Sequence, residues 1–405
     1  MSKYNYDKSL LKGLGVGAFL NEVKLREEHI ANGADTIPTS IYNPNILANK
    51  LHPAVQFVKV KEIIDRGDAK TYVFEPDETK GTKQLAYFKA GQYISVVVEF
   101  NGAFMCKPYS LCSSPKKALG EKDNTYAITI KVQKDGYAST YILNNWKVGT
   151  EVVISAPVGQ FTYERLRDRK DVIAIAGGSG ITPFVSMASA IADGIQDFNL
   201  TILYGSRTYD SILLRSELDD IVSRANGKVK VVHVLSDEQK DGFEHGFINE
   251  TLIRKYAPED YSIFVCGPKA MYKFVTDEIA KLDLPRRKVR FEISGEYGNP
   301  TNDEKYPRDK ADKTYNVKVW IRGESQDITC KSEESLLHAM ETAGIRVLSD
   351  CRSGFCGWCH SRLISGETYI PETNDGRRAA DKKFGWVHPC VTFPLSDIEI
   401  EVFPK

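Results

Sequence analysis

Four cysteines in the last part of the chain have a spacing that is suited to binding metal. Cys351, Cys356 and Cys359 follow the pattern C-x4-C-x2-C, and Cys390 lies farther along the chain. A single loop can bring three thiolates to nearly one point, and a distant residue can then close the far side. This spacing is typical of a [2Fe–2S] cluster that is held by four thiolates.

Glycines lie between these cysteines, and other metal sites fit the pattern less well. Gly354 and Gly357 allow the backbone to approach inorganic sulfides without a Cβ in the way. Structural zinc is usually held by paired C-x-x-C units, and this chain has a single one. A Rieske centre needs two histidine ligands, whereas His360 directly follows Cys359 and all the ligands here are thiols. Cysteines gathered by chance in a core are the weaker explanation.

Length and composition frame this site. The 405 residues are enough for about three domains. The 54 basic residues balance the 54 acidic residues, so no overall charge favours nucleic acid or a membrane surface as a partner. No long apolar run predicts a transmembrane helix, and the first residues lack the pattern of a signal peptide. Eight cysteines, four of them expected to bind metal, suit a reducing compartment, so we expect a cytoplasmic protein without membrane insertion.

Residues 1–53 are expected to form an N-terminal extension. The pattern over 18–30 predicts one amphipathic helix, and Asn45 is the expected cap of a short helix that ends at Leu51. We expect the extension to pack as a strap on the domain that follows it. A docking surface for a partner is the alternative.

Residues 54–163 contain short alternating runs separated by turn residues, which predicts an antiparallel β-barrel with strands over 57–61, 71–74, 93–100, 126–132 and 151–154. Two motifs in this domain suit a nucleotide-like ligand. The first is Lys107-Pro108-Tyr109-Ser110, which offers a cation, an aromatic ring and a hydroxyl. The second is a glycine turn into a helix N-terminus, which suits phosphate and includes Gly136, Ser139 and Thr140. Each motif alone is also compatible with an ordinary strand or helix.

Residues 164–293 predict a doubly wound α/β domain, because continuous apolar runs over 172–176, 200–204, 229–235 and 262–266 alternate with helical stretches. The first run leads into a glycine turn and a helix that starts near a proline. A pyrophosphate could approach this turn, and the helix N-terminus offers free N–H groups. The residues concerned are Gly177, Gly178, Gly180, Thr182 and Pro183.

Cys266, Gly267 and Pro268 end what we expect to be the last strand of that sheet. Ligands of such sheets bind outside the carboxyl ends of the strands, so Cys266 is expected where a nicotinamide would lie. A small buried thiol without a role is the alternative. Residues 294–313 have the composition of a linker. Residues 314–405 predict a small domain with strands over 315–321, 326–330 and 398–403, a helix over 333–343 and the cysteine loop.

Taken together, these segments resemble the ferredoxin–NAD(P)⁺ reductase superfamily over about residues 57–403. More narrowly, they resemble its three-domain members, with the domain order of phthalate dioxygenase reductase and similar oxygenase reductases. The motifs over 91–93 and 157–161 also match landmarks of the family's barrel. The resemblance implies a multidomain protein: an antiparallel β-barrel flavin domain, a doubly wound α/β nicotinamide domain and an α+β, β-grasp, plant-type ferredoxin domain.

The resemblance also implies roles for residues of the barrel. Tyr109 would flank the flavin, Ser110 would approach its N5 atom, and Ser139 and Thr140 would hold phosphate. Lys107 stands where the family has arginine, which keeps the charge but loses the bidentate fork. The Gly-x-x-Ser form of the phosphate motif is closer to the FAD-binding members, so we expect FAD, with FMN as the alternative.

Ser110, Cys266 and Glu292 are the expected catalytic residues. Many relatives carry an aromatic residue two positions after the glutamate that corresponds to Glu292, and here that position is Ser294. NADPH-using relatives grip the 2′-phosphate with a Ser-Arg pair, whereas here Asp237 follows the serine and would repel that phosphate.

Arg207 argues in the other direction, because an arginine can accommodate a 2′-phosphate. We expect NADH to be preferred, with NADPH as the alternative.

The implied function is electron transfer. Hydride from the nicotinamide passes to the flavin, and electrons then pass singly to the cluster and on to another protein, whose identity the sequence does not reveal. One alternative is a flavin enzyme that acts directly on a small molecule, with the ferredoxin domain feeding electrons in. Another is a redox-sensing module without turnover, which the intact nicotinamide and flavin motifs argue against.

Overall fold

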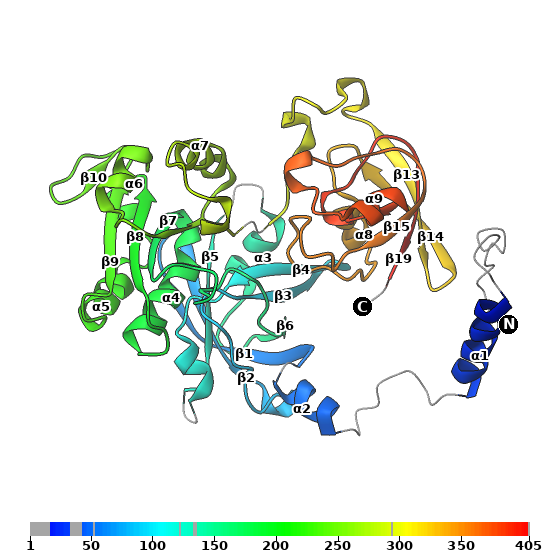
Figure 1. Ribbon diagram of the computed structural model, residues 1–405, viewed down its shortest axis with the longest axis horizontal. Helices are drawn as coiled ribbons and strands as arrows, with labels where there is room; N and C mark the ends of the chain where they lie inside the picture. Colours follow the sequence, from blue (N-terminus) through cyan, green and yellow to red (C-terminus); the bar gives the residue numbers. More distant parts are fainter. Residues whose placement is uncertain are drawn as a thin grey trace. The chain divides into compact units, whose positions relative to one another are not determined.

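Two helices make up the described part of the N-terminal extension. The computed structural model describes residues 17–32, 43–51, 53–120, 123–132, 136–292 and 295–403. The chain divides into two units, Met1–His52 and Pro53–Lys405. In the first unit, α1 (Gly17–Asn32) and α2 (Asn43–Leu51) confirm the expected helices (Figure 1). The expected cap was wrong, because Asn45 lies inside α2. Packing of the extension as a strap stays a prediction.

An antiparallel sheet forms the first domain of the second unit, with strand order β4-β3-β6-β1-β2-β5. Its strands are β1 (Val55–Asp65), β2 (Ala69–Pro76), β3 (Tyr93–Phe100), β4 (Ala103–Ser110), β5 (Tyr126–Lys131) and β6 (Glu151–Ser155). A bridge between Leu111 and Ile128 draws the two edges together into a half-barrel. Helix α3 (Tyr137–Asn145) packs on β4 through Ala138 and Met105.

A parallel sheet forms the second domain, with strand order β10-β9-β8-β7-β11-β12. Its strands are β7 (Asp171–Gly177), β8 (Asn199–Ser206), β9 (Val229–Leu235), β10 (Glu244–His245), β11 (Ser262–Cys266) and β12 (Val289–Phe291). The expectation that Cys266 ends the last strand was wrong, because the short β12 pairs with β11 beyond it. Its three residues are too short a run for a sequence pattern to reveal.

Helices cover both faces of this sheet, as its doubly wound pattern predicts (Figure 1). Along β7, Ala174 packs with the residues of α4 (Thr182–Ala192) and α5 (Arg215–Arg224). Its neighbour Ile173 packs on the opposite face with those of α6 (Glu250–Tyr256) and α7 (Lys269–Ala280). The carboxyl ends of β7 and β11 therefore meet at the point where the strand order reverses, which is where such sheets bind ligands.

A mixed sheet forms the third domain, with strand order β14-β13-β19-β15-β17. Its strands are β13 (Thr314–Ile321), β14 (Glu324–Lys331), β15 (Ser361–Ser365), β17 (Trp386–Val387) and β19 (Ile398–Val402). Beside it lie the pair β16 (Thr368–Tyr369) and β18 (Phe393–Pro394), and helices α8 (Leu336–Thr342) and α9 (Ala379–Lys383). Helix α8 begins later than expected, because the Ser335 side chain caps it by accepting from the N–H of His338.

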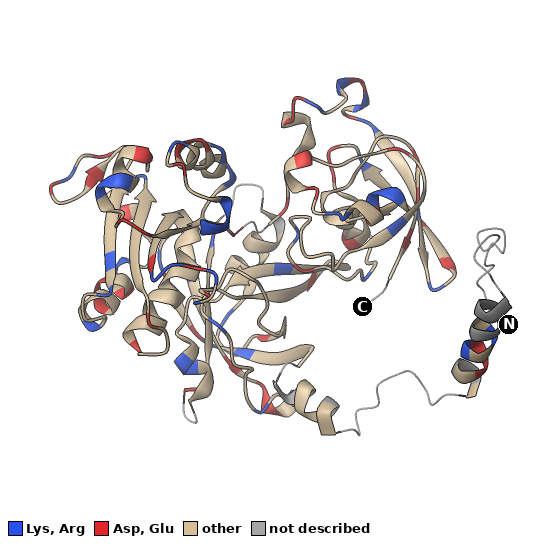
Figure 2. Cartoon of the chain, viewed as in Figure 1, with Lys and Arg blue, Asp and Glu red and all other residues tan. Residues whose placement is uncertain are grey.

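The segment expected to be a linker is packed rather than loose in its described part. It contains two short 3₁₀ turns, Pro300–Asn302 and Arg308–Lys310. Tyr306 is buried and meets the ring of Tyr369 edge-on at 5.1 Å. The domain boundaries themselves stay predictions. Basic and acidic residues are spread over the three domains rather than gathered on one element (Figure 2), and none of the described helices is long and apolar enough to span a membrane.

Candidate functional site

The four cysteine side chains of the expected metal site lie as two pairs. The sulfur atoms of Cys359 and Cys390 are 3.4 Å apart. Cys351 and Cys356 share a hydrogen bond that lowers the pKa of Cys351 and raises that of Cys356. Among the described residues, no three His, Cys, Asp or Glu side chains converge on one point as a single ion requires. Two neighbouring thiol pairs fit a cluster with two irons, so these residues can hold a [2Fe–2S] cluster.

Backbone N–H groups of the loop point at these sulfur atoms. The backbone nitrogen of Cys356 lies 3.4 Å from Sγ of Cys351, and that of Ser353 lies 3.5 Å from the same atom. The backbone nitrogen of Trp358 lies 3.5 Å from Sγ of Cys356. Hydrogen bonds to cluster sulfurs tune the reduction potential, so the loop geometry is suited to redox work.

Gly354 is required by packing as well as by backbone conformation. Its φ is +90°, and a Cβ there would lie 2.1 Å from the carbonyl oxygen of Asn374. Gly357 also has a positive φ, of +75°. The loop therefore depends on glycine at both positions. Their expected role beside the inorganic sulfides stays a prediction.

One edge of the loop faces solvent. Cys356 is exposed, whereas the other three cysteines are buried. Phe355 and Trp358, on either side of this edge, expose 46% and 53% of their surface. An electron carried here would have a short route to a docked protein.

Asp350, which precedes the first cysteine, reaches strand β3 of the half-barrel. The Tyr93 hydroxyl donates a hydrogen bond to Oδ2 of Asp350 at 3.0 Å, and the Ser95 hydroxyl donates one to Oδ1. All three side chains are buried. Burial and the charge of Asp350 raise the pKa of Tyr93, so its hydroxyl keeps the proton that it donates.

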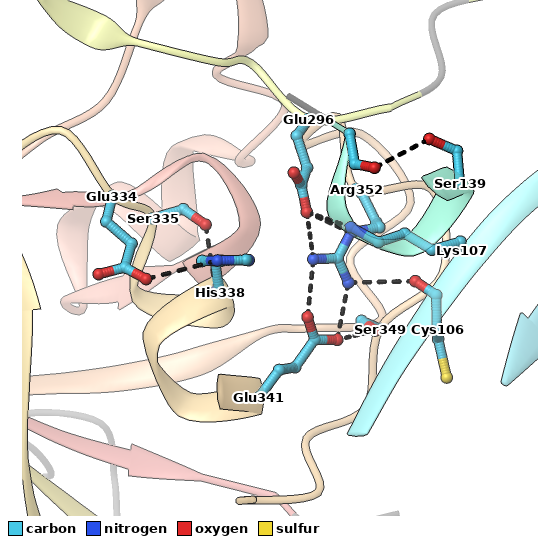
Figure 3. A network of polar contacts seen from close by, with 11 residues as sticks. Cys106, Lys107, Ser139, Glu296, Glu334, Ser335, His338, Glu341, Ser349 and Arg352 are labelled. Carbon is cyan, nitrogen blue, oxygen red and sulfur yellow. Dashed lines mark hydrogen bonds and ion pairs between the residues drawn. The ribbon is translucent and has the colours of Figure 1, made fainter. Parts of the chain in front are cut away.

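Arg352, which follows the first cysteine, is enclosed by carboxylates (Figure 3). Its Nη1 and Nη2 each donate to one oxygen of Glu341 in α8 at 2.7 Å. Its Nε donates to Glu296 at 2.9 Å, and Nη1 donates to the Cys106 carbonyl on β4 at 3.1 Å. Lys107 on β4 donates to the same Glu296 oxygen at 2.6 Å. Two cations and two carboxylates thus meet between β4, α8, the linker and the cysteine loop.

The two cations of this network keep Glu296 ionised. Burial opposes ionisation of Glu296, but the charges of Arg352 and Lys107 outweigh it and hold its pKa well below the usual range. Burial and repulsion by Arg352 lower the pKa of Lys107, against the pull of Glu296. The side chain of Arg352 is fully buried, so losing a carboxylate partner would leave a charge that water cannot reach.

The motif over 107–110 lies at the end of β4, beside this network. Ser110 stands opposite Tyr93 on β3. Tyr109 is buried enough that its pKa is raised, and the charges of Arg352 and Glu296 act on it as well. Lys107, expected to meet phosphate, has its ammonium on Glu296. Pro108 lies on β4 between Lys107 and Tyr109. The flavin roles of all four residues stay predictions.

The second barrel motif forms a helix N-terminus, as expected. Gly136 is the N-cap of α3 and has no side chain with which to cap it, which leaves the first N–H groups of the helix to a ligand. Ser139 donates to the Gly136 carbonyl at 3.2 Å. Thr140 is exposed in the first turn. Because α3 packs on β4, the two motifs lie on adjoining elements, and together they fit a flavin phosphate.

In the second domain, the glycine turn and the turn after β11 pack directly together. A Cβ on Gly180 would lie 2.2 Å from the carbonyl oxygen of Cys266, and one on Gly177 would lie 3.0 Å from Pro268. A Cβ on Gly267 would meet the Met271 side chain at 2.3 Å. The glycines at 177 and 180 therefore make room for this packing, which the sequence did not reveal.

Gly178 is the glycine that best fits a ligand-facing role. Its φ is +52°, and in the described part of the chain nothing lies within 4 Å of a Cβ placed there. A 3₁₀ turn, Gly178–Ile181, leads into α4, and Pro183 lies in the first turn of that helix as expected. Thr182 donates to the Ser179 carbonyl at 2.9 Å. The turn and the helix N-terminus can accept a pyrophosphate.

Glu292 follows β12 and lies near both the β11 turn and the cysteine loop. It is 8% exposed, and burial together with the charge of Cys351 raises its pKa to about 8. Burial and the charge of Glu292 raise the pKa of Cys266, which is therefore a neutral thiol. Glu292, the turn after β11 and the cysteine loop therefore lie close together. Ser294 lies outside the described residues.

Arg207 and Asp237 form an ion pair at the outer end of this sheet. Nε of Arg207 lies 2.8 Å from Oδ2 of Asp237. The Ser236 hydroxyl donates to the other oxygen of the same carboxylate at 2.7 Å. Arg207 and Asp237, which argue for opposite nicotinamide preferences, therefore bind each other. The Asp237 carboxylate neutralises the Arg207 guanidinium.

The contacts between the half-barrel and the cysteine loop were missed by sequence reasoning. The position of Arg352 inside the cysteine motif was the one signal that could have drawn attention to it. Asp350 and Glu341 carry no local pattern that would name their partners. Glu296 lies in a segment that its composition marked as a linker.

Three families match consecutive parts of the chain. Residues 58–163 match the oxidoreductase FAD-binding domain, residues 174–277 match the oxidoreductase NAD-binding domain, and residues 319–395 match the 2Fe-2S iron-sulfur cluster binding domain. The cofactors are therefore FAD and a [2Fe–2S] cluster, with NAD(P)H as the reductant.

Two curated relatives match this chain over most of their length. The glycine betaine monooxygenase reductase subunit of Chromohalobacter salexigens is 27% identical over 359 residues, covering 84% of this chain and 94% of the relative. The ferredoxin reductase component of 3-ketosteroid-9-alpha-monooxygenase from Mycobacterium tuberculosis is 28% identical over 349 residues, covering 84% and 93%.

A solved structure shows the same fold. Phthalate dioxygenase reductase superposes with a TM-score of 0.60 at 24% identity, covering 86% of this chain and 98% of that chain. The chain therefore contains an FAD-binding, an NAD-binding and a 2Fe-2S ferredoxin domain in the order of phthalate dioxygenase reductase, and it is an oxidoreductase that passes electrons from NAD(P)H through FAD to a [2Fe–2S] cluster and on to a partner protein.

Proposed function

We propose that this chain is the reductase component of an oxygenase system and that its cysteine loop delivers electrons to the oxygenase. The observation that carries the proposal is the exposed edge of the loop, where Cys356 lies between the exposed rings of Phe355 and Trp358. Apolar rings around an exposed ligand suit transient docking of a protein. The names of the two relatives, each a reductase part of a monooxygenase, support an oxygenase as that protein.

The nicotinamide domain would bind and orient the reductant. When bound, NADH supplies a hydride, FAD takes up its two electrons together, and the cluster carries one electron at a time. Gly178 and the N-terminus of α4 would hold the pyrophosphate. Cys266, a neutral thiol, and Glu292 would border the nicotinamide at the carboxyl ends of β11 and β12.

The half-barrel would bind the flavin between its two motifs. Tyr109 and Ser110 would border the ring system at the end of β4. Ser139 and Thr140 would offer the N-terminus of α3 to phosphate. Lys107 would share its ammonium between phosphate and Glu296, since it already lies 2.6 Å from that carboxylate.

NADH is the proposed nicotinamide. The Asp237 carboxylate lies 2.8 Å from Arg207, so it both engages the cation that a 2′-phosphate would need and repels that phosphate. A free ribose hydroxyl could instead donate a hydrogen bond to the same carboxylate. A reducing cytoplasm, where thiols persist, stays our prediction for the location.

Electron delivery to purified oxygenase components tests the proposal. The NADH-reduced protein would be mixed anaerobically with the oxygenase components of glycine betaine monooxygenase and of 3-ketosteroid-9-alpha-monooxygenase, and reduction of their metal centres followed by absorbance. We expect at least one to be reduced, and more slowly by Trp358→Ala than by the parent. Glu372→Gln serves as the matched surface control. Thr140→Ser is unsuitable as a control, because Thr140 belongs to the proposed flavin site.

The rival function is direct reduction of a small molecule at the flavin. It predicts that neither oxygenase component accepts electrons and that a small molecule is turned over at the flavin, with the ferredoxin domain feeding electrons in. That combination would contradict the proposal.

A further inference from the structure

The two residues that flank the first cluster ligand, Cys351, both reach the half-barrel. Asp350 accepts hydrogen bonds from Tyr93 and Ser95 on β3. Arg352 donates to a backbone carbonyl of β4. These two strands are neighbours, paired in register along their whole length. The ligand is therefore held between two attachments to adjoining strands of the flavin domain.

We propose that Asp350 and Arg352 are positioning residues that clamp the cluster loop onto the flavin half-barrel and so fix the path of the electron from FAD to the cluster. The clamp has a β3 arm, formed by Asp350 with Tyr93 and Ser95. It also has a β4 arm, formed by Arg352 with the Cys106 carbonyl and, through Glu296, with Lys107.

Burial makes these contacts strong. Asp350, Tyr93 and Ser95 are buried, and Arg352 is 1% exposed. Hydrogen bonds to an ionised group that is shielded from water are stronger than neutral bonds, and losing one leaves a buried group unsatisfied. A second contact between the same domains is different in kind. Nη2 of Arg346 lies 3.6 Å from Oε2 of Glu99, with the side chains 61% and 63% exposed, and such surface pairs contribute little.

The backbone at Arg352 is consistent with a positioning role. Its φ is +56°, in the left-handed region that a residue with a side chain seldom occupies. Strain of this kind persists where surrounding contacts determine the conformation. The bidentate pair with Glu341 and the contact with Glu296 supply such contacts. On either side of this turn, Sγ of Cys351 lies 3.4 Å from the backbone nitrogen of Cys356, and the guanidinium enters the network.

The step that the clamp serves is the passage of one electron from reduced FAD to the oxidised cluster. No bond forms or breaks in this step, and the cluster needs no proton. The clamp residues contribute by holding distance and orientation, which a rigid support shell does better than a mobile one. Because this step precedes delivery to any protein, the proposal does not depend on the identity of the acceptor.

The β3 arm can be removed without touching the cysteine loop. Tyr93→Phe combined with Ser95→Ala deletes both hydroxyls and keeps the ring of residue 93. We expect unchanged iron content, an unchanged cluster EPR spectrum and an unchanged rate of flavin reduction by NADH in stopped flow. Cluster reduction should be at least about tenfold slower, since two charge-assisted hydrogen bonds that favour the docked loop are lost. Glu99→Gln, which alters the exposed pair, should match the parent throughout.

Hydrogen–deuterium exchange provides a readout that does not involve activity. In the double variant, amides of the cysteine loop and of β3 should exchange faster, while those of β7 and β11 should not change. Equal exchange and equal cluster reduction in parent and double variant would overturn the proposal. So would an equal slowing of flavin reduction by NADH, because the residues would then support the whole unit rather than the clamp.

Glu296→Gln tests the β4 arm. It also takes the place of the Tyr93→Phe, Ser95→Ala double variant if the double variant does not accumulate. We expect the same selective slowing of cluster reduction, with faster exchange of the cysteine loop. An unchanged rate in Glu296→Gln would overturn the β4 arm. Failure of every oxygenase to accept electrons would contradict the proposed function and leave the clamp intact, so the two outcomes are distinguishable.

Discussion

Arg352 and Glu341 form a two-pronged contact in which each terminal nitrogen of the arginine lies 2.7 Å from a different oxygen of the carboxylate. The arginine side chain is fully buried and that of the glutamate is 2% exposed. One residue belongs to the cysteine loop and the other to α8, so the contact ties the loop to the helix beside it. Only the planar fork of arginine can make such a pair, which lysine could not reproduce.

Glu341→Gln should therefore destabilise the ferredoxin domain by about 3 kcal/mol, because it removes a carboxylate from a buried cation. Thermal loss of the cluster's visible circular dichroism would measure the effect. Glu372→Gln is the matched control, since the Lys305–Glu372 pair is exposed at both side chains, and it should shift stability by less than about 0.5 kcal/mol. Equal transition temperatures for both variants would show that the buried pair adds nothing.

Gly180→Ala should impair use of NADH without affecting the flavin. The added Cβ would lie 2.2 Å from the carbonyl oxygen of Cys266, so the glycine turn or the β11 turn must move. We expect kcat/KM for NADH with ferricyanide to fall at least about tenfold, in line with the strong dependence of catalysis on positioning. FAD content should stay at the parent level.

Gly227→Ala is the matched control for this substitution. Its φ is +77°, and in the described part of the chain its added Cβ would have no neighbour within 4 Å. It therefore carries the backbone cost of a left-handed residue without the collision. A loss of NADH activity in Gly227→Ala as large as in Gly180→Ala would argue against the packing explanation.

Glu292→Gln should alter how stability depends on pH. The pKa of Glu292 is raised from 4.5 to about 8 by burial and by the charge of Cys351. Between these values the folded state binds more protons than the unfolded state, so stability falls as pH rises through this window. The neutral glutamine has no such dependence. We expect the variant to melt above the parent at pH 8, with the difference shrinking toward pH 5. The same difference in melting temperature between variant and parent at both pH values would rule out a raised pKa of Glu292.

Asp237→Ser should shift the enzyme toward NADPH. The substitution removes the repelling carboxylate and frees Arg207, now paired at 2.8 Å, to meet a 2′-phosphate. We expect kcat/KM for NADPH to rise about tenfold, the effect of one charge-assisted contact, and that for NADH to fall slightly. In the parent, NADH should be the better substrate. A clear NADPH advantage in the parent would mean that Arg207 outweighs Asp237.

Local patterns made much of this structure predictable. The cysteine spacing predicts the four cluster ligands, because one loop supplies three of them. Alternating and continuous apolar runs identify most strands of the three sheets, because the period reports which faces are buried. The glycine turn before α4 was found because it follows a buried strand and precedes a proline.

Contacts between distant segments were not predictable in this way. Tyr93 and Asp350 are 257 positions apart, and neither has a neighbour that signals the other. Glu296 gains its role from two cations brought in by different domains. The packing of Gly180 was not foreseen either, because the turn that fills the space beside it follows another strand, β11. Such features depend on how the domains assemble, which no local period records.

The order of electron transfer, from nicotinamide through flavin to cluster and then to protein, is the central claim. Cys351→Ser tests it most directly, because a neutral hydroxyl is a poor substitute for a thiolate ligand. Iron should fall from about two atoms per chain in the parent. Cys106→Ser and Cys330→Ser, at buried thiols outside the loop, serve as controls and should keep both activities described next.

The measurement is NADH oxidation by Cys351→Ser with ferricyanide and with cytochrome c as alternative acceptors. Hydride transfer needs only the half-barrel and the nicotinamide domain, so ferricyanide reduction should stay near the parent rate. Cytochrome c reduction should be mostly lost, because delivery to a protein requires the cluster. A variant that keeps its FAD but loses ferricyanide reduction, or one that keeps full cytochrome c reduction without its cluster, would contradict the order.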